Sequence, residues 1–152
     1  MKSLRIKTKE VSEVFQILNG CKYTKLEDAD KVKVWKIGRA LRPIADKFNE
    51  DSQSAAESMK PTEDFSERFQ QAQEFEKAKS ENRATPISDE EYMKFVGEFR
   101  KYNDLVNKAI NEYAEKEVEL EIETISEDAF GKLMSSNEWT VAQTMKVEII
   151  VG

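Results

Sequence analysis

YMKFVGEFRKYNDLVNKAINEY, the stretch from Tyr92 to Tyr113, has large apolar residues at alternating steps of three and four positions. Side chains at this spacing line one side of an α-helix and must be buried against another element. Ser88 followed by Glu91 predicts a capping box that starts this helix. The apolar stripe, widened by Val96, Leu105 and Ile110, consists of Tyr92, Phe95, Phe99, Tyr102, Val106, Ala109 and Tyr113.

A second stripe with the same spacing precedes it in the chain. It predicts a long helix that opens near Asp28 or Asp30, with a kink at Pro43. Two stripes of matching period in one chain favour a long antiparallel helical hairpin over pairing between chains, although coiled-coil oligomers have the same pattern. The second stripe consists of Val34, Ile37, Leu41, Ile44 and Phe48.

Two segments alternate between apolar and polar residues, as half-buried strands do. These are Leu4–Thr8 and Glu117–Glu123, and we expect them to pair, because an isolated strand leaves its backbone groups unsatisfied. Pairing would bring Arg5 and Lys7 opposite the glutamates. Residues 140–151 are ambiguous, with a helix capped by Thr140 favoured over a third strand. The expected fold is a single, mainly α domain of residues 1–152 with a small two-stranded β element.

Composition and charge restrict the function. The 152 residues are 39% hydrophobic and 36% charged, and the formal net charge of −6 argues against general affinity for nucleic acid or an anionic membrane. The lone Cys21 allows no internal disulfide, which favours a reducing compartment. No apolar run approaches the roughly 20 residues that a transmembrane helix needs. We therefore expect an intracellular protein.

The residues that enzymes use most are absent or scattered. Without histidine, Ser-His-Asp and Cys-His catalysis are excluded, and the five glycines form no phosphate-binding loop. The alternating glutamates of Glu117–Glu123 could attract a divalent cation. Neighbouring ones lie about 6.6 Å apart on a strand, so a solvated outer face is favoured. We predict no catalytic, cofactor-binding or metal-binding residue and no cofactor.

Candidate interaction residues remain. Lys36, Arg39 and Arg42 share one helix face beside Trp35 and could meet phosphates or an acidic protein surface. The alternative is an outer face that pairs with its own acidic neighbours. The apolar candidates for a binding surface are Phe65, Phe69, Phe75 and Trp139.

The layout of the chain resembles a family of small phage- and prophage-encoded proteins of unknown function. The likeness lies in Leu4–Thr8 with Val11–Leu18, in the basic helix that follows, in Glu119–Ile122, and in Trp139–Gln143. The resemblance implies an accessory or structural protein in a bacterial cytoplasm or associated with a virion.

The leading functional hypothesis is a non-enzymatic protein that acts through protein–protein interaction, with self-association left open. One alternative is a metal-dependent hydrolase of nucleotides or other small substrates that uses carboxylates. The other is a nucleic-acid-associated regulator that uses Lys36, Arg39 and Arg42.

Overall fold

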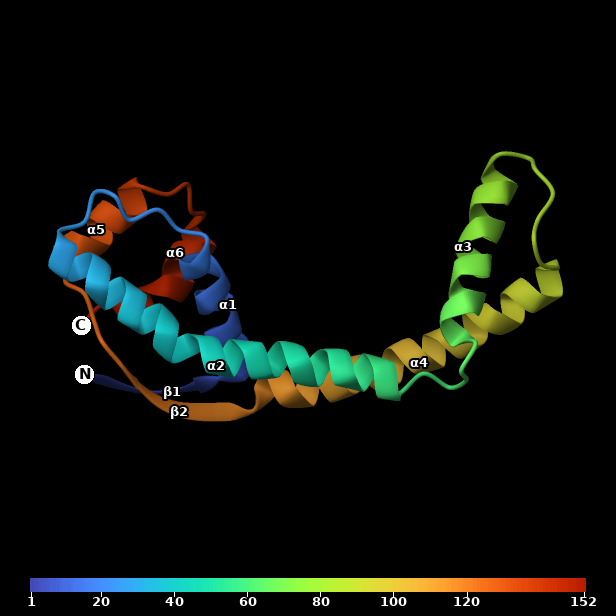
Figure 1. Cartoon of the computed structure of the whole chain (residues 1–152), viewed down its shortest axis with the longest axis horizontal. Coiled ribbons are helices and arrows are strands. Elements are labelled where there is room, and N and C mark those ends of the chain that lie inside the picture. Colours follow the sequence, from blue (N-terminus) through green and yellow to red (C-terminus); the bar gives the residue numbers. More distant parts are fainter. The chain divides into compact units, whose positions relative to one another are not determined.

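The computed structural model describes all 152 residues, and its chain is mainly α-helical, as the sequence predicted (Figure 1). Two strands are present, β1 (Lys2–Lys7) and β2 (Glu117–Ile122). The helices are α1 (Thr8–Asn19), α2 (Asp28–Ser58), α3 (Phe65–Ser80), α4 (Asp89–Glu115), α5 (Glu127–Ser135), α6 (Val141–Val147) and the 3-10 turn η1 (Glu148–Ile150).

The chain divides into two compact units. Unit 1 combines residues 1–51 with 112–152, and unit 2 is the continuous segment 52–111. The boundaries between the units therefore fall inside α2 and α4. Each unit has its own apolar core.

Unit 1 contains the predicted two-stranded sheet. β1 and β2 pair antiparallel, with Leu4 opposite Leu120, and they lie side by side in Figure 1. Arg5 Nε lies 2.7 Å from Glu117 Oε2, so the expected pairing of basic and acidic outer faces is confirmed. Successive side chains of a strand point to opposite faces, so the apolar side chains of both strands face the core and the charged ones face solvent.

The core of unit 1 contains most of the second apolar stripe of the sequence. Val34, Ile37 and Leu41 of α2 are buried in it. Their spacing places them on one face of the helix, which packs on α1, α5 and the end of β2. The side chains that meet them from these elements are Val11, Val14, Leu18, Ile122, Ala129, Phe130 and Leu133.

Unit 2 contains the first half of the Tyr92–Tyr113 stripe. Phe95 of α4 packs with Phe65 and Ala72 of α3, and four partly buried aromatic residues surround this core. In the same unit Tyr102 donates a hydrogen bond from its hydroxyl to the carbonyl of Ala56, near the end of α2. This contact belongs to the antiparallel hairpin of α2 and α4. The four surrounding residues are Phe69, Tyr92, Phe99 and Tyr102.

The stripe of α4 does not stay on one buried face to its end. Leu105 and Tyr113 are exposed, contrary to the prediction, and Ala114 is buried in place of Tyr113. Helix geometry alone does not expose Tyr113, because it lies about five whole turns after the buried Phe95 and points in the same direction. Between these two residues α4 passes from unit 2 into unit 1, so the surroundings of the helix change along its length.

The predicted helix starts carry their caps. Ser88 Oγ accepts a hydrogen bond from the Glu91 N–H at 3.1 Å, and α4 begins at the following residue, Asp89. Thr140 and Gln143 form a reciprocal capping box at the start of α6. The helical interpretation of residues 140–151 is therefore confirmed. What remains of the alternative third strand is one bridge between Val151 and Ile125.

Candidate functional site

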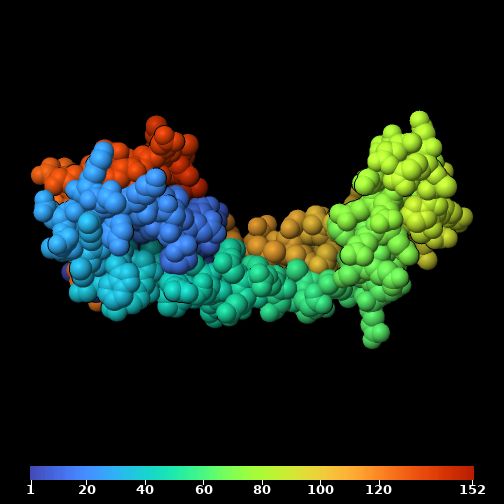
Figure 2. Space-filling model, turned by 45° about the horizontal axis from the view of Figure 1, so that its top comes forward, coloured from blue at the N-terminus to red at the C-terminus, as the bar shows by residue number.

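A groove of about 450 Å³ opens in unit 1 between α1 with its following loop and α2. Its volume lies within the range of sites that hold small ligands or the side chains of a partner. In Figure 2 the two elements, in blue and cyan, adjoin on the visible face of the unit. The lining residues are Phe15, Leu18, Asn19, Cys21, Tyr23, Val34, Trp35, Gly38, Arg39 and Arg42.

The α2 side of the groove follows from helix geometry. Trp35, Gly38 and Arg42 are spaced by three and four residues, so they form one row along the helix. This row lies beside the buried stripe that contains Val34. One edge of the row therefore meets the core of unit 1, and the other edge meets solvent.

Trp35 and Arg39 form a stacked pair at the groove. The guanidinium carbon of Arg39 lies 4.4 Å from the centroid of the Trp35 ring, within the distance of a cation–π interaction. Trp35 is 56% exposed, an unusual state for so large an apolar side chain. The stacking restricts both side chains while leaving surface on each of them open to a ligand.

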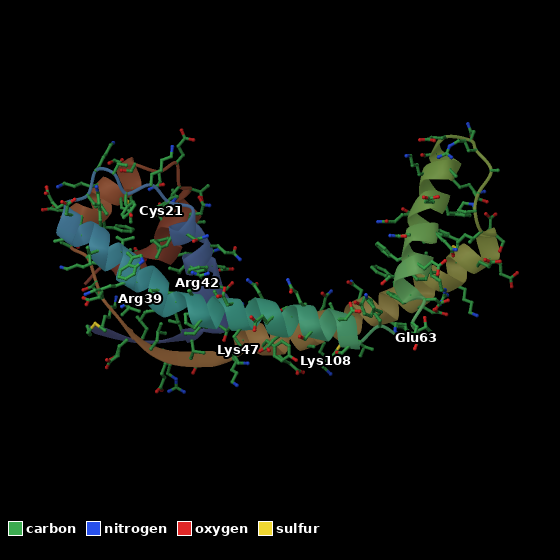
Figure 3. All side chains as sticks on the ribbon, in the orientation of Figure 1. Cys21, Arg39, Arg42, Lys47, Glu63 and Lys108 are labelled. Carbon is green, nitrogen blue, oxygen red and sulfur yellow. The ribbon has the colours of Figure 1, made fainter.

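The basic stripe predicted from the sequence divides here. Arg39 and Arg42, which are labelled on α2 in Figure 3, line the groove. Lys36 is exposed and does not line it. Arg42 Nε lies 3.5 Å from Asp46 Oδ2, in an exposed pair that water and salt screen. The predicted alternative of a face paired with its own acidic neighbours thus applies to Arg42 alone of the two groove arginines.

The opposite wall contains residues that sequence reasoning did not connect to a site. Cys21 and Tyr23 follow α1 and face the groove. Burial raises the pKa of the Cys21 thiol, which keeps it protonated at neutral pH. The signals that could have identified this site were the Trp35–Arg39 step of four residues and a glycine, Gly38, in the interior of a helix.

The predicted apolar candidates belong to the two cores instead. Phe65 and Phe75 are buried, and Phe69 is partly buried against the same core as Phe65, because all three meet the aromatic stripe of α4. Trp139 is partly buried on the core of unit 1, with its ring centroid 6.3 Å from that of Phe130. These four side chains therefore form no exposed binding face, in contrast to the prediction.

A second cavity of about 420 Å³ lies between α1 and α6 of unit 1. Val141 and Met145 are exposed on α6, and Met145 lines this cavity with Ile149. Lys146 at its rim lies 3.4 Å from Glu13. This cavity lacks the combination of exposed aromatic and free basic groups that marks the α1–α2 groove.

The carboxylates of the chain do not converge. No group of three or more Asp, Glu or Cys side chains has the arrangement that a metal ion requires. The glutamates of β2 lie instead opposite β1, where Glu119 is the register partner of Arg5.

No helix combines the length and apolar character needed to cross a membrane. Comparison of the chain with protein-family models, with curated proteins and with solved structures finds no match.

Proposed function

We propose that this chain is a non-enzymatic interaction protein whose α1–α2 groove binds a partner protein. The observation that carries the proposal is the exposed Trp35 ring, stacked on Arg39 at the edge of a groove with an apolar wall. Tryptophan and arginine are, together with tyrosine, enriched among the residues that dominate binding energy at protein interfaces. Here they occur together, held in a defined geometry.

The biological setting in this proposal comes from the resemblance to small phage and prophage proteins. It is that of an accessory or structural protein in a bacterial cytoplasm or on a virion. The proposal concerns the groove and does not depend on which of these settings applies.

Charge supports a protein partner over nucleic acid. The net charge of −6 opposes phosphate binding over the whole chain, and Asp46 partly neutralises Arg42 within the stripe. The apolar side chains of the groove, Phe15, Leu18 and Val34, offer a phosphate backbone no hydrogen-bond donor and no positive charge. They suit the buried side chains of a protein interface.

The test is affinity purification from the native host with the tagged chain and two variants of α2. Trp35→Ala removes the exposed ring from the groove. Val32→Ala is the matched control, because Val32 is also an exposed apolar residue of α2 and does not line the groove. Circular dichroism verifies that both variants keep the helical content of the parent.

We expect one or more proteins that co-purify with the parent chain and with Val32→Ala and that disappear with Trp35→Ala. A set of co-purified proteins that is the same for all three chains, or that contains no stoichiometric partner, contradicts the proposal. A partner that is lost equally in both variants also contradicts it, because the loss would then not arise from the groove.

A further inference from the structure

We infer that the α1–α2 groove takes an acidic peptide segment of its partner, in which a large apolar side chain stands next to a carboxylate. This inference rests on the proposed function and specifies the chemistry of the partner. It follows from three features of the groove, namely its charge, its apolar wall and its bare floor at Gly38.

The charge of the groove is positive on one side. Its lining includes Arg39 and Arg42 and no acidic residue. Arg39 stacks on Trp35 and forms no ion pair, so its N–H groups remain available to an acceptor. Guanidinium groups bind carboxylates through paired hydrogen bonds, and an incoming carboxylate can replace the weak exposed contact between Arg42 and Asp46.

The opposite side of the groove is apolar. Phe15 and Leu18 of α1 line it, and Val34 adds a further apolar side chain from the α2 side. Transfer of an apolar side chain from water to such a wall contributes about 25 cal/mol per Å² of surface removed from water. An inorganic anion or a nucleic-acid backbone would use the arginines alone. A peptide with adjacent acidic and apolar side chains uses both sides.

Gly38 leaves room for that apolar side chain. A Cβ atom built at Gly38 would have no neighbouring atom within 4 Å, so packing does not require glycine here. Glycine in a helix interior costs about 1 kcal/mol relative to alanine. Its effect at this position is an open floor between Trp35 and Arg42, which a larger residue would fill.

The experiment selects random linear peptides displayed on phage against the purified full chain. We expect the enriched peptides to carry Asp or Glu beside Leu, Phe or Trp. A synthetic copy of the strongest peptide is then titrated against three variants by isothermal calorimetry. Its binding should also slow the modification of Cys21, the one thiol of the chain, by a maleimide, since Cys21 lines the groove.

The variants separate the two halves of the interaction. Gly38→Leu fills the floor while keeping both arginines. We expect it to keep the fold, which circular dichroism verifies, because leucine is a better helix former and a Cβ atom has free space at this position. Arg39→Gln removes one guanidinium. We expect each to weaken peptide binding by about tenfold or more. Lys36→Gln, the control, removes an equal charge from the same helix outside the groove and should leave affinity unchanged.

Three results with peptides would overturn the inference, namely enrichment of neutral or basic peptides, no enriched family at all, and a peptide whose affinity is unaffected by Gly38→Leu. Binding of duplex DNA at about 150 mM salt that Arg39→Gln abolishes would overturn it in favour of a phosphate ligand. If the peptide selection fails while co-purification still depends on Trp35, the proposed function stands and the acidic partner does not.

Discussion

Replacing Phe65 with alanine tests the core of unit 2 most directly. Phe65 begins α3 and is 3% exposed. Its ring centroid lies 5.2 Å from that of Phe95 and 4.7 Å from that of Tyr102. Phe65 therefore links α3 to two positions of α4 that lie about two turns apart, and its removal affects both contacts at once.

The expected loss of stability follows from the burial of Phe65. Phe→Ala changes in protein cores cost about 3–5 kcal/mol, the sum of lost transfer free energy and the cavity left behind. The core of unit 2 is small, and its partly buried neighbours Phe69 and Phe99 can move toward the cavity. We therefore expect a value near the lower end, about 3 kcal/mol.

Hydrogen exchange of the α3 and α4 amides, measured by mass spectrometry, gives the local free energy of opening. The control is Gln73→Ala, on the exposed face of α3, which should lie within about 0.5 kcal/mol of the parent. Phe99→Ala should cost less than Phe65→Ala, because Phe99 is only partly buried. A loss below about 1 kcal/mol for Phe65→Ala would refute the assignment of this residue to the core.

Three further predictions concern single contacts. Gly38→Ala should raise the free energy of unfolding by about 1 kcal/mol in urea titrations, and a loss would show that the floor of the groove is not open. Ser88→Ala should lower it by about 0.5–2 kcal/mol through loss of the N-cap, while an unchanged value would exclude this capping role. The hydrogen bond from Lys7, followed by that from Lys9, lowers the pKa of Glu115 from 4.5 to about 2. The ionised Glu115 carboxylate therefore contributes fully to the free energy of unfolding above pH 4.5, and this contribution is lost as the pH falls toward 2. Thermal melts of Glu115→Gln should show a shallower decline across that range than the parent, and parallel declines would contradict the assignment.

Local signals in the sequence were enough to predict the two long helices, the helix that starts after Thr140, the two strands and the pairing of these strands. The alternation in Glu117–Glu123 could be satisfied only by another strand, and Leu4–Thr8 was the remaining candidate. Ser88 and Thr140 marked helix starts through short-range hydrogen bonds, which depend on nothing distant in the chain. Such features can be predicted because apolar periodicity and helix capping depend only on the residues of the segment itself.

The partners of the apolar stripes were not predictable in the same way. Matching periods in α2 and α4 suggested that the two stripes face each other along their length. In the structure Ile37 and Leu41 pack on α1 and α5, while Phe95 packs on α3. An apolar stripe predicts that one face of a helix is buried, but it does not predict which element covers that face. The aromatic residues of α3 were for this reason expected to lie free.

The groove was predicted only in part, because it depends on the meeting of two elements. Arg39 and Arg42 were recognised from their spacing on one helix. Their combination with Phe15 and Cys21 arises from the packing of α1 on α2, which no local pattern encodes.

The division of the chain into two units has a consequence for its synthesis. Unit 2 is continuous in sequence, whereas β1 of unit 1 pairs with β2 across more than a hundred residues. Closing so long a loop carries an entropic cost, and contacts of this separation form slowly. On the ribosome, unit 2 can fold as soon as α4 has emerged. β1 cannot pair until β2 has been translated. During that interval the apolar side chains of β1 lack their native contacts, which makes this segment prone to aggregation.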